Sequence, residues 1–113
     1  MNTLSHPNSQ KIATLNDALR KRGEGGRIML TTGIQALGQK AVHEVIKQIR
    51  AFDAFTDDND PYGEHDFSSI AVNGNKIFWK IDAYDRNLEY GSPDPTDPAL
   101  TVRIMTVMLA EEY

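Results

Sequence analysis

The sequence has 113 residues, 40% of them hydrophobic and 25% charged, with no cysteine and a net charge of −4 at pH 7. These values are typical of one globular domain over residues 1–113, and they exclude disulfide frameworks, thiolate metal sites and cysteine nucleophiles. No apolar run approaches the roughly 18 residues of a membrane span, and the N-terminus lacks the apolar core of a signal peptide. We therefore expect a cytoplasmic protein with no membrane contact.

Charge is distributed unevenly along the chain. Residues 1–50 carry 8 Lys and Arg against 3 acids, whereas residues 51–113 carry 4 Lys and Arg against 13 acids. Such asymmetry indicates a charged partner, unless folding interleaves the two halves. A pI near 5.2 gives no broad basic footprint, so direct nucleic-acid binding is not expected.

The first half of the chain reads as helix, strand, helix. Residues 1–8 are expected to be frayed, and Asn8 or Ser9 can cap a helix that ends before Gly23. A short strand follows over Arg27–Thr31. A second helix is expected from about Gln39 to Phe52, because its apolar residues recur at helical spacing.

The second half predicts a hairpin and a final helix. Strands over Phe67–Val72 and Lys76–Tyr84 flank Asn73-Gly74, a strong signal for a type I′ turn. We read residues 99–112 as a helix, although their β-branched content also suits a strand. The prediction is an α+β domain of order α-β-α-β-β-α, with three helices packed on a small three-stranded sheet that contains the antiparallel hairpin.

The expected hairpin register suggests a catalytic site. A two-residue turn pairs Val72 with Asn75 and places His65 opposite Asp82, whereas a four-residue turn places His65 opposite Tyr84. In either register His65, Asp82 and Tyr84 share one face. His65 beside Asp82 could act as a general base with an orienting carboxylate. The alternative is a cross-strand ion pair on a solvated sheet face.

The acidic loop of residues 57–64 suggests a cation site. It fails the EF-hand pattern, because Tyr62 and Ser69 stand where oxygen-rich ligands belong. An irregular site for a hard cation remains open and would use Asp57, Asp58, Asp60 and Glu64. The alternative is a solvated loop. No cofactor is expected beyond a possible divalent cation.

Several motifs together resemble a known bacterial family. The combination is similar to the family catalogued as domain of unknown function 3768 and covers about residues 12–113; it comprises Leu15–Arg20, Arg50–Phe55, Asn59–Phe67, Phe78–Asp82 and Tyr90–Pro95. The resemblance implies a mostly alphaproteobacterial protein associated with plasmids and other mobile elements, sometimes near anti-restriction-like genes. It implies no activity, so no residue role follows from it.

Three functions are consistent with these observations. The first is a non-enzymatic accessory protein of mobile elements that inhibits a host defence nuclease, of the anti-restriction or anti-CRISPR type. Its acidic face would bind a protein partner through Asp57, Asp58, Asp60, Glu64, Asp66, Asp85 and Glu89. The second is a small metal-dependent enzyme or hydrolase centred on Glu64, His65, Asp66 and Asp82. The third is a homodimer that covers open sheet edges.

Overall fold

The computed structural model describes residues 7–113. The expected fraying of residues 1–6 lies outside the described residues. Residues 7 and 8, also expected to be frayed, form the start of the first helix. Proline suits this position, since the first helical N–H groups have no partner within the helix.

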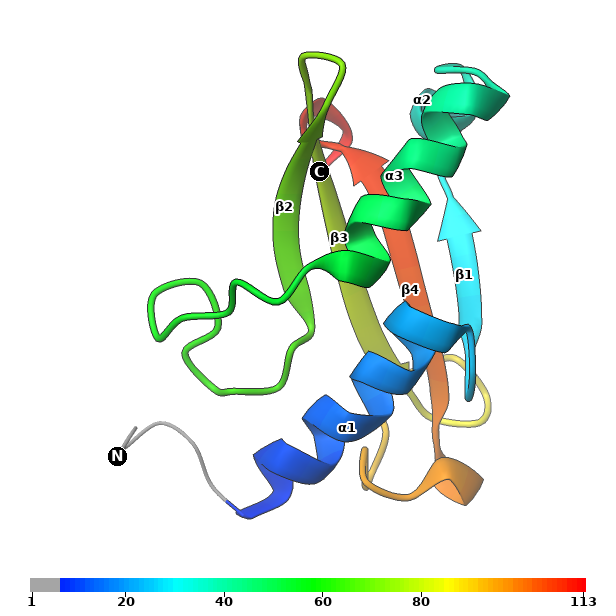
Figure 1. Ribbon diagram of the computed structural model, residues 1–113. Coiled ribbons are helices and arrows are strands. Elements are labelled where there is room, and N and C mark those ends of the chain that lie inside the picture. The colour runs from blue at the N-terminus through cyan, green and yellow to red at the C-terminus, as the bar shows by residue number, and fades with distance from the viewer. Residues whose placement is uncertain (1–6) are drawn as a thin grey trace.

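Four strands form one mixed sheet, one strand more than the sequence predicted (Figure 1). The strands are β1 (Arg27–Leu30), β2 (Phe67–Val72), β3 (Asn75–Tyr84) and β4 (Val102–Leu109). Their order is β1-β4-β3-β2, in which β1 runs parallel to β4 and the other pairs are antiparallel. The edge strands are therefore β1 and β2.

Residues 7–113 also form three α-helices: α1 (Pro7–Arg22), α2 (Thr32–Gln35) and α3 (Gln39–Ala51). The predicted end of α1 is confirmed, because Gly23 at φ 69° donates its N–H to Leu19 O, which closes the helix. The second predicted helix is also confirmed as α3, with Phe52 as its C-cap. The single turn α2 was not predicted, since four residues leave little periodic signal.

The hairpin forms in the predicted two-residue register. Val72 pairs with Asn75, Ile70 with Ile77, and Ser68 with Trp79. The turn residues Asn73 and Gly74 have φ of 52° and 81°, as a type I′ turn requires. Local turn chemistry therefore fixes the alignment of β2 with β3.

The predicted final helix over residues 99–112 is wrong. Asp97 caps only one 3₁₀ turn, η1 (Pro98–Leu100), and the chain then enters β4 before a last 3₁₀ turn, η2 (Ala110–Glu112). β4 lies between β1 and β3, so both of its edges are paired. β4 carries apolar residues on both of its faces, and period alone does not distinguish such a segment from a helix.

The core lies between the helices and one face of the sheet. In Figure 1, α1 and α3 both cross that face. The buried cluster is centred on Trp79 and includes Leu19, Ile34, Val45, Ile49, Ile77, Met105 and Val107. The sequence prediction that Trp79 is a core anchor is confirmed, since its side chain is fully buried. Within residues 7–113, no helix is both long and apolar enough to cross a membrane.

Candidate functional site

A buried arginine joins α1 to the end of α3. The guanidinium of Arg20, 1% exposed, donates Nη1 to Phe52 O at 2.7 Å and to Ile49 O at 2.8 Å. Its Nη2 donates to Asp17 Oδ1 at 2.9 Å. A buried charge is tolerated only when it is paired and hydrogen-bonded in this way. Arg20 thereby fixes where the loop of residues 53–66 leaves α3.

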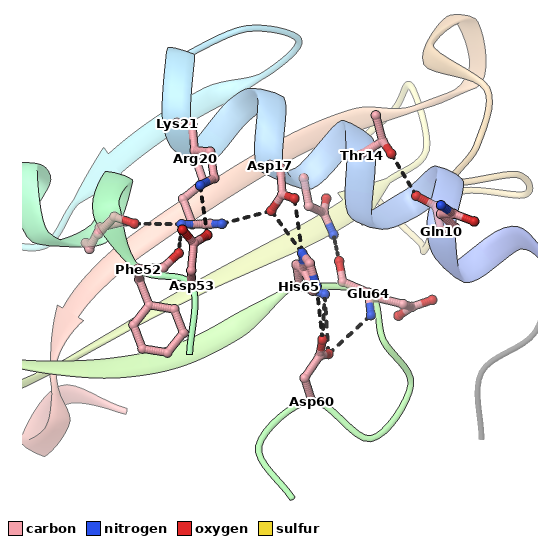
Figure 2. A network of polar contacts seen from close by, with 12 residues as sticks. Gln10, Thr14, Asp17, Arg20, Lys21, Phe52, Asp53, Asp60, Glu64 and His65 are labelled. Carbon is pink, nitrogen blue, oxygen red and sulfur yellow. Dashed lines mark hydrogen bonds and ion pairs between the residues drawn. The ribbon is translucent and has the colours of Figure 1, made fainter. Parts of the chain in front are cut away.

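His65 lies between two carboxylates (Figure 2). Its Nδ1 lies 3.1 Å from both Asp17 oxygens, and its Nε2 lies 3.7 Å from Asp60 Oδ2. The imidazole also stacks on Phe55, with ring centroids 4.0 Å apart and nearly parallel planes. His65 lies between both carboxylates and thus attaches the end of the loop of residues 53–66 to α1.

The predicted contact between His65 and Asp82 does not form. β2 begins only at Phe67, and His65 has a left-handed backbone with φ of 54°. That conformation directs its ring to Asp17 on α1. Asp82 instead pairs with Lys80 Nζ at 2.9 Å, and Tyr84 aligns with Val102 of β4. The three proposed catalytic residues are therefore not assembled as predicted.

Three acidic residues of the enzyme hypothesis do meet around one small hollow. Glu64, Asp66 and Asp82 line a hollow of about 190 Å³ together with Asn16 and Arg103. Arg103 is 3% exposed and donates Nε to Asn16 Oδ1 at 2.7 Å and Nη2 to Pro95 O at 2.6 Å. Asn16 in turn donates to Glu64 O at 2.9 Å. We call the hollow that these residues line the Asp66 hollow.

Burial changes the acid–base properties of two side chains in the Asp66 hollow. Burial raises the pKa of the Asp66 carboxyl, and the nearby charges of Asp60 and Asp82 raise it further. Burial lowers the pKa of Arg103, whereas the charge of Glu64 acts in the opposite direction. Asp66 consequently holds a proton more tightly than an exposed aspartate does.

The proposed partner-binding residues have different surroundings. Asp57, Asp58 and Glu89 are exposed, and Asp85 is half-buried where it accepts the N–H groups of Asn87 and Glu89. Asp60, by contrast, is 6% exposed and accepts the N–H groups of Glu64 and His65. Asp60 therefore shapes the loop from inside, and Glu64 and Asp66 belong to the Asp66 hollow.

The two acidic loops lie at the same end of the sheet. Because β2 and β3 are antiparallel, the loop that enters β2 and the loop that leaves β3 share one end, on either side of α1 (Figure 1). Among the exposed and half-exposed acids of these loops are Asp57, Asp58, Asp85 and Glu89, and we call these four residues the acidic end.

The metal candidates do not gather. Over residues 7–113, no three His, Asp or Glu side chains are placed to hold a metal ion together, and this includes Asp57, Asp58, Asp60 and Glu64. Binding of a divalent cation at these residues stays a prediction.

The sequence analysis did not predict the contacts that residues of α1 make in this network. Asp17 and Arg20 stand three residues apart on α1, a spacing that predicts contact between them. Their partners His65 and Phe52 are more than thirty positions away, and Asn16 meets Arg103 across 87 positions. No local sequence pattern predicts a contact between residues so far apart in the chain.

A protein-family model matches residues 30–112, which is most of the chain. The model describes a protein of unknown function, DUF3768. The chain belongs to this family. No curated protein and no solved structure matches the chain. The DUF3768 match includes Asp60, His65, Asp66 and Arg103, whereas α1 with Asp17 and Arg20 precedes it.

Proposed function

We propose that this DUF3768 protein is a non-enzymatic binding protein of bacterial mobile elements that inhibits a host defence nuclease in the cytoplasm. In this proposal the acidic end occupies a basic surface that otherwise binds nucleic acid. Carboxylates in a row can take the place of phosphates on such a surface, because complementary potentials steer and position partners.

The observation that carries the proposal is that two acidic loops lie at the same end of the sheet. The segment of residues 53–66 has six acids and no Lys or Arg, and the segment of residues 85–97 has four acids and one Arg. Lys21 pairs with Asp53 at 2.9 Å, and the side chains of Asp57 and Asp58 are exposed. Most acids of the second half of the sequence therefore lie at one end of the sheet.

Preorganisation of the loop supports the same proposal. Asp60 and His65 hold the loop ahead of β2, and Arg20 holds its start at Phe52. An ordered loop loses less conformational entropy when it binds than a disordered one. The acidic residues between these two anchors are therefore presented in a defined arrangement.

Plasmid transfer into a restricting host tests the proposal. Expression of the protein should raise the transformation efficiency of unmodified or CRISPR-targeted plasmid. The double reversal Asp57→Lys/Asp58→Lys should abolish that gain, because a basic surface repels lysine. Glu111→Lys is the matched control, since Glu111 is exposed but lies on η2, in a different part of the chain. Full protection by the double reversal would contradict the proposal.

A hydrolase centred on the Asp66 hollow is the second candidate. It is favoured by the raised pKa of Asp66, since a carboxyl that keeps its proton to higher pH suits general-acid chemistry. His65 has no part in this version, because Asp17 and Asp60 hold it. A thermal-shift series with Ca²⁺, Mg²⁺, Mn²⁺ and Zn²⁺ tests its metal dependence: a saturable rise in Tm that Asp66→Asn removes would favour it. Equal curves with and without each ion would count against it.

A further inference from the structure

A buried arginine and a half-buried aspartate line the Asp66 hollow without forming an ion pair. Arg103 is 3% exposed, and within residues 7–113 its side chain donates only to Asn16 Oδ1 and Pro95 O, which are both uncharged. Its Nη1 makes no hydrogen bond there but retains accessible surface. Neither Arg103 nor Asp66 has an ion-pair partner within 4 Å in that part of the chain. Buried charges are costly unless they are paired, so both charges are available to a ligand.

The strand register places these two residues on opposite sides of β3. Arg103 of β4 pairs with Ala83 of β3, whereas Ile81 on the same strand donates its N–H to Asp66 O. Two strand spacings, or about 10 Å, therefore separate the backbones of Asp66 and Arg103. Ala83 lines the hollow and fills little of this gap, because its side chain is a single methyl group. The two charges therefore share one open space of about 190 Å³.

The signs of the charges that line the hollow disfavour a ligand of a single charge. A lone anion beside Arg103 would approach the carboxylates of Glu64 and Asp66, which line the same hollow. A lone cation beside Asp66 would leave the buried charge of Arg103 unpaired. A zwitterion sets each of its charges against the opposite one. Because its net charge is zero, the acid-rich loop of residues 53–66 does not repel it.

The size and the apolar lining of the hollow limit the ligand to a short molecule. Its volume of about 190 Å³ is below the roughly 300–1,000 Å³ of pockets that bind drug-sized ligands. Beside the polar residues, Ile12, Ile81 and Ala83 contribute apolar surface to the lining. A few methylene groups that join an ammonium to a carboxylate suit such a surface. These properties together describe a small amino acid.

From these two charges and the space that they share, we propose that the Asp66 hollow binds a small free amino acid as its zwitterion. The ligand carboxylate accepts a hydrogen bond from Arg103 Nη1, since a guanidinium matches a carboxylate in geometry and charge. The ligand ammonium donates to the carboxylate of Asp66. The proposal requires binding alone, so it rests on neither nuclease inhibition nor hydrolysis. The acidic end has no residue in the lining of the hollow.

Thermal-shift and NMR titrations of the full chain with three amino acids test the proposal. Glycine, β-alanine and γ-aminobutyric acid hold their two charges at increasing separation. We expect at least one of them to raise Tm saturably and to shift the amide signals of Ile81, Ala83 and Arg103. The amide of that amino acid keeps only the ammonium, and its N-acetyl form keeps only the carboxylate. Each of these two derivatives should therefore bind at least tenfold more weakly.

Matched variants test the charge and the space separately. Asp66→Asn removes the partner of the ligand ammonium and should lower affinity at least tenfold; it should stay folded, because it removes an ionisation that burial opposes. Asp58→Asn removes the same charge from an exposed position and should bind as the wild type does. Ala83→Val narrows the hollow, keeps a residue that suits a strand, and should also lower affinity at least tenfold. Ala71→Val, on the exposed part of β2, should not.

Three results would overturn the proposal. The first is the absence of a saturable rise in Tm with all three amino acids. The second is wild-type affinity in folded Asp66→Asn, or amide shifts that leave Ile81, Ala83 and Arg103 unchanged. The third is equal affinity for the N-acetyl form, which would assign the hollow to a lone anion. Each of these results leaves nuclease inhibition through the acidic end untouched, because the plasmid-transfer assay tests different residues.

Discussion

At the scale of single residues, Arg20 and His65 explain how a long polar loop keeps one conformation. Arg20 binds two backbone carbonyls at the end of α3 and one carboxylate of α1. His65 then connects that same carboxylate to Asp60. Arg20 also lies 5.2 Å from the ring centroids of Phe55 and Trp79, so the polar network is continuous with the core.

Removal of the Arg20 side chain should strongly destabilise the fold. Arg20→Ala removes the buried side-chain donor of the Ile49 and Phe52 carbonyls and the partner of Asp17, and we expect the free energy of unfolding to fall by about 3 kcal/mol. Lys21→Ala is the matched control, because its ion pair with Asp53 is largely exposed to solvent and should contribute little to stability. Urea unfolding measures both. Equal losses in the two variants would show that Arg20 does not anchor the loop.

Asp66 should give the protein a distinctive dependence of stability on pH. Its pKa in the folded chain is raised above the ordinary value of 3.8, so the folded state binds the proton more tightly than the unfolded state. Ionised Asp66 therefore opposes folding at neutral pH, and this cost disappears as the pH falls through the raised pKa towards 3.8.

Asp66→Asn removes this ionisation. We expect the variant to be more stable than the wild type at pH 7, with a difference that shrinks as the pH is lowered towards 3.8. Thermal unfolding of both proteins over that pH range measures the difference. A variant that is less stable than the wild type at every pH would contradict the assignment.

At the scale of secondary-structure elements, the sequence predicts what local chemistry determines. Asn73-Gly74 sets the hairpin register, and Gly23 ends α1, because both depend on backbone conformations that neighbouring residues encode. β4 was mistaken for a helix because its identity depends on pairing with β1 and β3, which are distant in sequence. The contact of His65 was predicted wrongly for a related reason, because its ring meets a residue of α1 that is distant in sequence.

The turn between α1 and β1 depends on a glycine for steric reasons. A Cβ at Gly26 would collide with Arg103 O and lie 2.9 Å from Leu19 Cδ2. Gly26→Ala should therefore lower the free energy of unfolding by about 1–3 kcal/mol, as overpacking does elsewhere. Gly91→Ala is the control, because nothing lies within 4 Å of a Cβ there. Similar urea midpoints for the two variants would contradict this account of the turn.

At the scale of the whole molecule, folding places the two acidic loops at one end of the sheet, on either side of α1. Asp57, Asp58, Asp85 and Glu89 lie in these loops, while α3 exposes Lys40, Lys47 and Arg50. Composition predicted the asymmetry but not its placement, because placement depends on which ends of β2 and β3 meet. Such a separation of charge suits a protein that contacts partners through distinct surfaces.

The most direct test of the proposed function is an affinity pull-down from an alphaproteobacterial lysate, run at low and high salt and read by mass spectrometry. The wild-type protein and Asp57→Lys/Asp58→Lys are compared side by side, with Glu111→Lys as control. We predict that the wild type and the control retain a defence nuclease subunit at low salt and release it at high salt, and that the double reversal does not retain it. Equal retention of that subunit by the double reversal, or no nuclease on any column, would contradict binding through the acidic end.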